Sequence, residues 1–201
     1  MAKIAVLGSG GFGLSLAVMT DAHNHDVTVW SAFADEIEML KKEREHKNLL
    51  PGVKINENID LITDISGIKD CDIVIFAIPS SFVRKIAVMA APFIKKDAVV
   101  VNAGKGLEDD TFKRLSVVLS EEIPDNKIVS ISGPSHAEEV ALVYPTTVTV
   151  ASLDRDAMYY IQDELSNESF RIYACDDIIG VEMGGAMKNI IALCAGICDG
   201  M

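Results

Sequence analysis

The chain has 201 residues, of which 49% are hydrophobic, and its formal net charge is −12 at pH 7. This length and composition are enough to bury a core in one domain or slightly more. The negative charge disfavours nucleic acid and anionic membranes as partners, because basic surfaces bind phosphate backbones. No uninterrupted apolar run reaches the ~18 residues of a membrane-spanning helix, and no signal peptide precedes the first predicted strand. We therefore expect a cytoplasmic protein without stable membrane insertion.

The cysteine pattern predicts neither a disulfide framework nor a metal site. Cys71, Cys175, Cys194 and Cys198 include no CxxC pair and no paired zinc spacing. Cys194 and Cys198 are one helical turn apart and could chelate an ion. Their apolar neighbours favour a buried, reduced helix face instead.

The first strand and helix carry a glycine-rich turn, KIAVLGSGGFG, from Lys3 to Gly13. The apolar stretch before the turn is typical of a buried parallel strand. Gly8 permits a tight turn, Gly10 allows the backbone to approach a pyrophosphate, and Gly13 allows the helix to pack on the strand. The helix N-terminus supplies unpaired N–H groups. A GxGxxG between a strand and a helix therefore predicts dinucleotide binding.

Apolar strand candidates then alternate with helical segments along the chain. This alternation predicts an α/β, Rossmann-type, doubly wound parallel sheet with helices on both faces. The expected strands are residues 4–7, 25–30, 72–78, 98–102, 127–132, 146–152 and 170–174, and the expected helices are 34–44, 82–94, 111–122 and 154–165.

The pattern changes after residue 176, where no further strand is predicted. Residues 177–201 read as one long helix that is apolar on most sides and runs into Met201 without a stop signal. Such a helix usually packs against another domain or subunit. We expect residues 1–176 to form the dinucleotide-binding domain and 177–201 to begin a truncated all-α substrate domain. The apolar helix also makes self-association, as in a homodimer, an open expectation.

Two lysines lie where chemistry is expected. Lys105 follows a buried strand in NAGKGL, and ligands of open α/β sheets bind outside the carboxyl ends of the strands. SGPSHAEE follows another strand and should face the same crevice. Lys188 lies among apolar and small residues of the long helix, which predicts partial desolvation and a lowered pKa suited to proton transfer. Glu182, on the same helix, is expected to pair with a lysine.

The motifs VLGSGGFG, HKNLLPG, FAIPSSFV, NAGKGLE, SGPSHAEEVA and VEMGGAMKNIIALCAGICDG occur in this order and cover nearly the whole chain. Together they closely resemble the bacterial NAD(P)-dependent glycerol-3-phosphate dehydrogenase family. The resemblance implies an oxidoreductase that transfers hydride reversibly between nicotinamide and C2 of dihydroxyacetone phosphate or sn-glycerol 3-phosphate. That reaction supplies glycerophospholipid synthesis and links lipid to carbohydrate metabolism.

The resemblance also implies roles for individual residues. Lys188 matches the general acid/base, and Lys105 matches a residue near both cofactor and substrate. The implied substrate contacts are Lys105, Gly133, Ser135, Lys188 and Asn189. The implied cofactor contacts are Gly8, Gly10, Gly11, Phe12, Gly13, Phe33, Phe82, Lys105 and Ala137.

The chain departs from the family pattern in its second strand, which bears on the choice between NAD and NADP. Enzymes that use NAD often carry an acid at the end of this strand for the ribose 2′-OH. Here the strand ends at Trp30 and continues SAFADE, with neither an acid there nor an Arg or His between Ser31 and Ala34. Asp35 and Glu36 would repel a 2′-phosphate if they are close. The sequence therefore favours NAD without excluding NADP.

Family members continue into a helical domain that supplies an Asp beside the catalytic lysine and an Arg for the substrate phosphate. Without these groups we expect a truncated form with little turnover. Two alternatives remain open. One is a related dehydrogenase of hydroxy acids or sugar acids, and the other is a non-catalytic module that only binds NAD.

Overall fold

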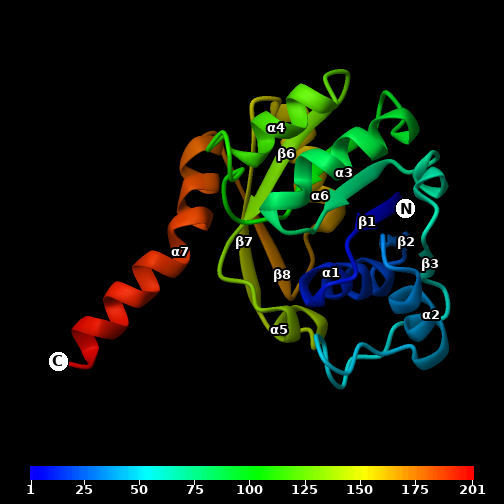
Figure 1. Cartoon of the computed structure of the whole chain (residues 1–201), viewed down its shortest axis with the longest axis horizontal. Coiled ribbons are helices and arrows are strands. Elements are labelled where there is room, and N and C mark those ends of the chain that lie inside the picture. The colour runs from blue at the N-terminus through cyan, green and yellow to red at the C-terminus, as the bar shows by residue number, and fades with distance from the viewer.

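The computed structural model describes residues 1–201 as one mixed sheet with helices on both faces (Figure 1). The strands are β1 (Lys3–Leu7), β2 (Asp26–Trp30), β3 (Asp60–Ile62), β4 (Ile73–Phe76), β5 (Val99–Asn102), β6 (Lys127–Ser132), β7 (Thr146–Ser152) and β8 (Phe170–Cys175). The helices are α1 (Gly11–Ala22), α2 (Ala34–Glu43), α3 (Val83–Ala90), α4 (Leu115–Glu122), α5 (Ala137–Ala141), α6 (Arg155–Leu165) and α7 (Ile178–Asp199). Three short 3₁₀ turns span Ile65–Ile68, Ser80–Phe82 and Ala91–Phe93.

The strand order is β3-β2-β1-β4-β5-β6-β7-β8, which confirms the predicted Rossmann-type fold class. The first six strands of this order run parallel. The expectation of a wholly parallel sheet was wrong at one junction, because β7 pairs antiparallel with β6, and β8 follows the direction of β7. The short strand β3 was not predicted.

The connection between β6 and β7 carries the short helix α5 of five residues, which packs against α1. The chain re-enters the sheet at the end where β6 finished, and β7 runs in the opposite direction. The eleven-residue α6 is long enough to return the chain and allow β8 to lie parallel to β7.

The sheet separates two apolar cores, and the alternation of side chains along β1 shows the division. Ile4 and Val6 belong to the core that α1, α2 and α6 cover. Ala5 and Leu7 belong to the core that α3 and α4 cover. All four are fully buried, as expected for a central strand with helices on both faces.

Helix α7 leaves the body of the molecule after its first turns, shown as the red helix in Figure 1. Of its residues only Ile178 and Glu182 are buried. The prediction that Cys194 and Cys198 lie on a buried face was therefore wrong: both are exposed. Within residues 1–201 no element packs on the second half of α7, so local sequence pattern could not decide its burial.

Helix α7 is also long and apolar enough, by length and average hydropathy, to cross a membrane. The sequence analysis predicted no membrane-spanning segment because it counted only uninterrupted apolar runs. The charged residues Glu182 and Lys188 interrupt the apolar run of α7. A core helix of a globular protein meets the same criteria. The first turns of α7 pack against β6 and β7.

Candidate functional site

The glycine-rich turn lies between β1 and α1, at the carboxyl edge of the sheet. Gly8 adopts a φ of +120°, and a Cβ there would lie 2.4 Å from the Ala77 carbonyl oxygen. A Cβ on Gly13 would lie 2.2 Å from the Gly8 carbonyl oxygen. A Cβ on Gly10 would meet nothing within 4 Å. Gly8 and Gly13 therefore shape the turn, whereas the surface at Gly10 is open for a ligand.

This turn fits the pyrophosphate of a dinucleotide. Gly10 is the N-cap of α1, so no side chain accepts a hydrogen bond from the first amides of that helix. The first turn of α1 also carries no acidic residue. Amides at a helix N-terminus and the helix dipole favour an anion at this place. The residues present therefore fit the cofactor that the sequence motif predicts.

A cavity of about 280 Å³ opens beside the turn and collects residues from three strand ends. Among its lining residues are Phe12 from α1, Lys105 from the loop after β5, and Ser135 and Ala137 from the segment after β6. These were all predicted site residues. The structure therefore brings the first motif, NAGKGL and SGPSHAEE to one crevice, as the rule for strand ends requires.

A second cavity, of about 510 Å³, lies between the carboxyl end of β6 and helix α7. Gly133, Lys105 and Lys188 line it, together with the α7 glycines Gly184 and Gly185. A Cβ on Gly185 would lie 2.7 Å from Ser132 Oγ and 3.7 Å from Lys105 Cγ. The absence of a side chain at this position therefore allows α7 to approach the loop that carries Lys105.

Lys105 lines both cavities and is the residue they share. Its ammonium Nζ lies 5.0 Å from the centre of the Phe12 ring, within the range of a cation–π contact. Burial lowers the pKa of Lys105 from its ordinary value of 10.5, and the charge of Lys188 lowers it further. Neither lysine forms an ion pair with any carboxylate of residues 1–201.

The prediction that Lys188 is desolvated was wrong. Lys188 is exposed, because the part of α7 that carries it extends away from the sheet. The desolvated lysine is Lys105, which the sequence had placed in the loop after a buried strand without predicting its burial. Asn189 is also exposed and lines neither cavity. Phe33 and Phe82 lie at the starts of α2 and α3 with 71% and 54% of their surfaces exposed, outside both cavities.

Sequence reasoning missed the role of Glu182, which anchors α7. Its carboxylate is buried and pairs with the Arg114 guanidinium at 2.7 Å, not with a lysine. It also accepts hydrogen bonds from the Ser116 amide and hydroxyl, the Ser130 hydroxyl and the Asn102 side chain. The sequence feature that could have predicted this role is a single acidic residue within an apolar stretch of helix, because a buried charge requires partners.

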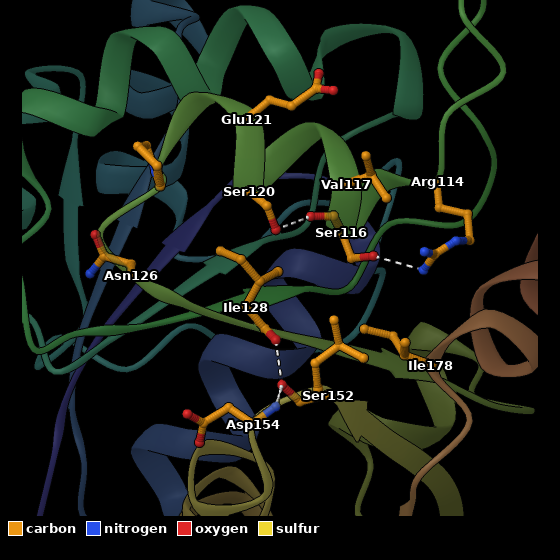
Figure 2. A pocket seen from close by; sticks show the side chains of 12 residues that line it. Arg114, Ser116, Val117, Ser120, Glu121, Asn126, Ile128, Ser152, Asp154 and Ile178 are labelled. Carbon is orange, nitrogen blue, oxygen red and sulfur yellow. Dashed lines mark hydrogen bonds between the residues drawn. The ribbon is translucent and has the colours of Figure 1, made fainter.

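A further pocket, of about 330 Å³, adjoins this anchor and contains none of the predicted site residues (Figure 2). In Figure 2 the Arg114 side chain points towards the Ser116 hydroxyl, and Ser152 donates to the Ile128 carbonyl. The polar groups shown there are occupied within the protein. We assign this pocket no function.

The pKa of Lys105 gives a first testable prediction. Because the pKa is lowered, Lys105 should lose its proton and become acylated at a lower pH in the folded chain than in the chain unfolded by urea. The unfolded chain binds more protons in the window between the lowered pKa and 10.5, so the unfavourable contribution of this group to folding diminishes as the pH rises through that window. Mass-spectrometric mapping of acylation against pH would measure both midpoints. Equal midpoints for Lys105 in the folded and the unfolded chain would contradict the assignment.

Comparisons with known proteins agree with this geometry. Residues 3–158 match the family model described as NAD-dependent glycerol-3-phosphate dehydrogenase N-terminus, and residues 177–201 match the model described as its C-terminus. The whole chain is 42% identical to a glycerol-3-phosphate dehydrogenase [NAD(P)+] of Agathobacter rectalis and 44% identical to that of Bacillus subtilis. It spans 60% and 59% of the lengths of these relatives.

Solved structures give the same result. The glycerol-3-phosphate dehydrogenase of Coxiella burnetii superposes with a TM-score of 0.92 at 30% identity, over 99% of this chain and 61% of that chain. A UDP-D-ManNAc dehydrogenase of Pyrococcus horikoshii superposes over 94% of this chain and 50% of that chain with a TM-score of 0.80, but its 15% identity shows a shared fold alone. The chain therefore belongs to the NAD-dependent glycerol-3-phosphate dehydrogenase family, whose members are NAD(P)-dependent oxidoreductases.

Proposed function

We propose that this chain binds NAD(H) or NADP(H) together with dihydroxyacetone phosphate or sn-glycerol 3-phosphate, and takes part in reversible hydride transfer between them in the cytoplasm. Residues 1–176 form the dinucleotide-binding part in this proposal, and residues 177–201 begin the substrate-binding part. The observation that carries the proposal is the pair of lysines, Lys105 and Lys188. Two cations without a carboxylate partner face one cavity next to the dinucleotide turn.

The chemistry of this pair suits a phosphorylated substrate. Lys188 lowers the pKa of Lys105 through repulsion between their charges, and a bound phosphate dianion would relieve that repulsion. A phosphate would also add charge-assisted hydrogen bonds to both ammonium groups. We therefore place the substrate phosphate in the cavity between β6 and α7, which Gly133 lines. Ser135, which lines the neighbouring cavity, and Asn189, which follows Lys188 on α7, are proposed as contacts of the rest of the substrate.

The cofactor would lie along the glycine turn, with Gly8, Gly10, Gly11, Phe12 and Gly13 at its phosphates. Phe33, Phe82, Lys105 and Ala137 would be its other contacts, as in the family pattern. When bound, the nicotinamide would provide the hydride exchange with the substrate's C2. Lys188 then donates a proton to the C2 oxygen in the reducing direction and accepts it in the reverse direction. The charge of Lys105 stabilises the developing alkoxide.

The exposed apolar residues of α7 support a further proposal, that this helix mediates self-association. They include Ile190, Ile191, Leu193 and Ile197, and apolar patches of this kind usually mark interaction sites.

Thermal-shift titration with NADH and NADPH, each with and without dihydroxyacetone phosphate, tests the proposal without requiring turnover. Saturation at about 100 times the dissociation constant adds about 2.7 kcal/mol to the free energy of unfolding. We expect a shift with dinucleotide that grows when the phosphate is added. Lys105→Met should abolish the additional shift, whereas Lys69→Met, an exposed control, should not.

The remaining outcomes separate the alternatives. A shift with dinucleotide alone would support a non-catalytic NAD-binding module and contradict the substrate site. No shift with any ligand would mean that the glycine turn serves the fold only.

A further inference from the structure

The carboxylate of Glu36, in the first turn of α2, joins three segments around the glycine turn. The hydroxyl of Ser9, within that turn, donates a hydrogen bond to Oε2 of Glu36. The hydroxyl of Ser31, just after β2, donates to the same oxygen at 2.9 Å. The ring Nε2 of His46, from the HKNLLPG motif, lies 3.2 Å from Oε1. The end of β2, the glycine turn and the HKNLLPG loop therefore converge on one acid.

The hydrogen bonds of His46 define which group donates and which accepts in this network. Its Nδ1 accepts from the Leu49 amide at 3.2 Å, so a neutral ring carries its hydrogen on Nε2 and donates it to Glu36. The Leu49 carbonyl oxygen in turn would lie 2.5 Å from a Cβ on Gly11. The network therefore holds the HKNLLPG loop over the start of α1, beside the expected cofactor phosphates.

The same network leaves a surface that accepts hydrogen bonds. Ser9 and Ser31 are buried, with 4% and 3% of their surfaces exposed, and both donate their hydroxyl protons to Glu36. The accessible group of the network is therefore the Glu36 carboxylate, of which 22% of the side chain is exposed and which only accepts hydrogen bonds. In dinucleotide-binding folds this place, between the glycine turn and the end of the second strand, receives the adenosine ribose. A ribose 2′-OH can donate to such a surface. A 2′-phosphate carries about −1.5 to −2 charges at pH 7 and has only acceptor oxygens.

We propose that Glu36 selects a dinucleotide with an unphosphorylated adenosine ribose, and so makes the chain prefer NADH over NADPH. The inference rests on the dinucleotide site of the proposed function. Glu36 takes the role that an acid at the end of β2 has in other NAD enzymes, but it reaches the site from α2. The basic side chain beside Glu36 is His46, whose Nε2 faces Oε1 at 3.2 Å and is taken up by that contact. Residues 31–34 contain no basic side chain, and the basic residues of α2, Lys41 and Lys42, lie in its last turn.

The test compares binding of NADH and NADPH by thermal shift and by quenching of Trp30 fluorescence. Glu36→Gln removes the charge and keeps the shape of the side chain. We expect the ratio of the two dissociation constants to shift towards NADPH by about tenfold or more, which corresponds to about 1.4 kcal/mol. Glu36→Asp retains a carboxylate and should retain the preference for NADH. Glu38→Gln, an exposed acid on the same helix, is the matched control and should leave the ratio unchanged.

Each other result overturns the inference or the proposed function. An unchanged ratio in Glu36→Gln, or equal weakening of both dinucleotides, would show that Glu36 only holds the loops together. Preference for NADPH in the unsubstituted chain would overturn the inference directly. If the unsubstituted chain bound neither dinucleotide, the proposed function itself would fail. Should Glu36→Gln not fold, loss of the NADH preference in Ser31→Ala, which removes one committed hydroxyl, would support the network, and its retention would contradict it.

Discussion

Replacement of Gly8 by alanine should destabilise the protein by about 2–6 kcal/mol. A φ of +120° strains any residue with a Cβ by about 1–3 kcal/mol. The new Cβ would also lie 2.4 Å from the Ala77 carbonyl oxygen and 2.9 Å from an Ile78 methyl carbon. Overpacking of this kind costs about 1–3 kcal/mol more. Because the contact is with backbone at the end of the neighbouring strand, small side-chain movements cannot relieve it. Urea unfolding monitored by circular dichroism would measure the loss.

Gly10→Ala is the matched control, since a Cβ at Gly10 meets no atom within 4 Å and its φ is −65°. This variant should keep most of its stability, with at most about 1 kcal/mol lost at the N-cap. Its affinity for NADH should nevertheless fall by about tenfold or more, or about 1.4 kcal/mol, because the methyl group would occupy the path of the pyrophosphate. Full stability of Gly8→Ala, or unchanged NADH affinity of Gly10→Ala, would contradict the roles assigned to these glycines.

Removal of the Glu182 carboxylate should have the second large effect. Glu182→Ala leaves the Arg114 guanidinium and the donors of Ser116, Ser130 and Asn102 without their acceptor. Breaking a buried ion pair typically costs about 3–5 kcal/mol. Since 23% of the Arg114 side chain is exposed and can be hydrated, we expect a value near the lower limit. Helix α7 should then detach first, because its only other buried residue is Ile178.

Hydrogen exchange of the α7 amides and urea unfolding together would measure this effect. The additional thermal shift with dihydroxyacetone phosphate should disappear in Glu182→Ala while the shift with NADH remains, because α7 carries Lys188 and the dinucleotide turn does not depend on it. Glu121→Gln is the control, since Glu121 forms exposed ion pairs with Arg84 and Lys113 that are worth at most about 1 kcal/mol. Unchanged protection of α7 in Glu182→Ala would show that other contacts hold the helix.

The sequence determined the strands and helices where periodicity was strong. The predicted bounds of β6 and β7 match the structure, and α2 and α6 were predicted to within one residue at each end. Local pattern could not show the direction of β7, because strand direction depends on where the preceding connection packs, here with α5 against α1. The three-residue β3 lacks enough residues for a pattern to be recognised.

The features of the candidate site also divide into those that the sequence predicted and those that only the tertiary structure decided. The sequence by itself determined the family motifs and the glycine-rich turn between β1 and α1, and it predicted a role for Lys105, because glycine spacing and strand ends are local features. Only the tertiary structure decided that Lys105 rather than Lys188 is desolvated, that Glu182 pairs with Arg114, and that Glu36 joins the glycine turn to β2 and the HKNLLPG loop. The Ser9–Glu36 and Arg114–Glu182 contacts join residues 27 and 68 positions apart, and desolvation depends on burial by neighbouring elements. Neither is encoded in a local pattern, because charge pairing and desolvation arise only when the sheet has brought its strand ends together.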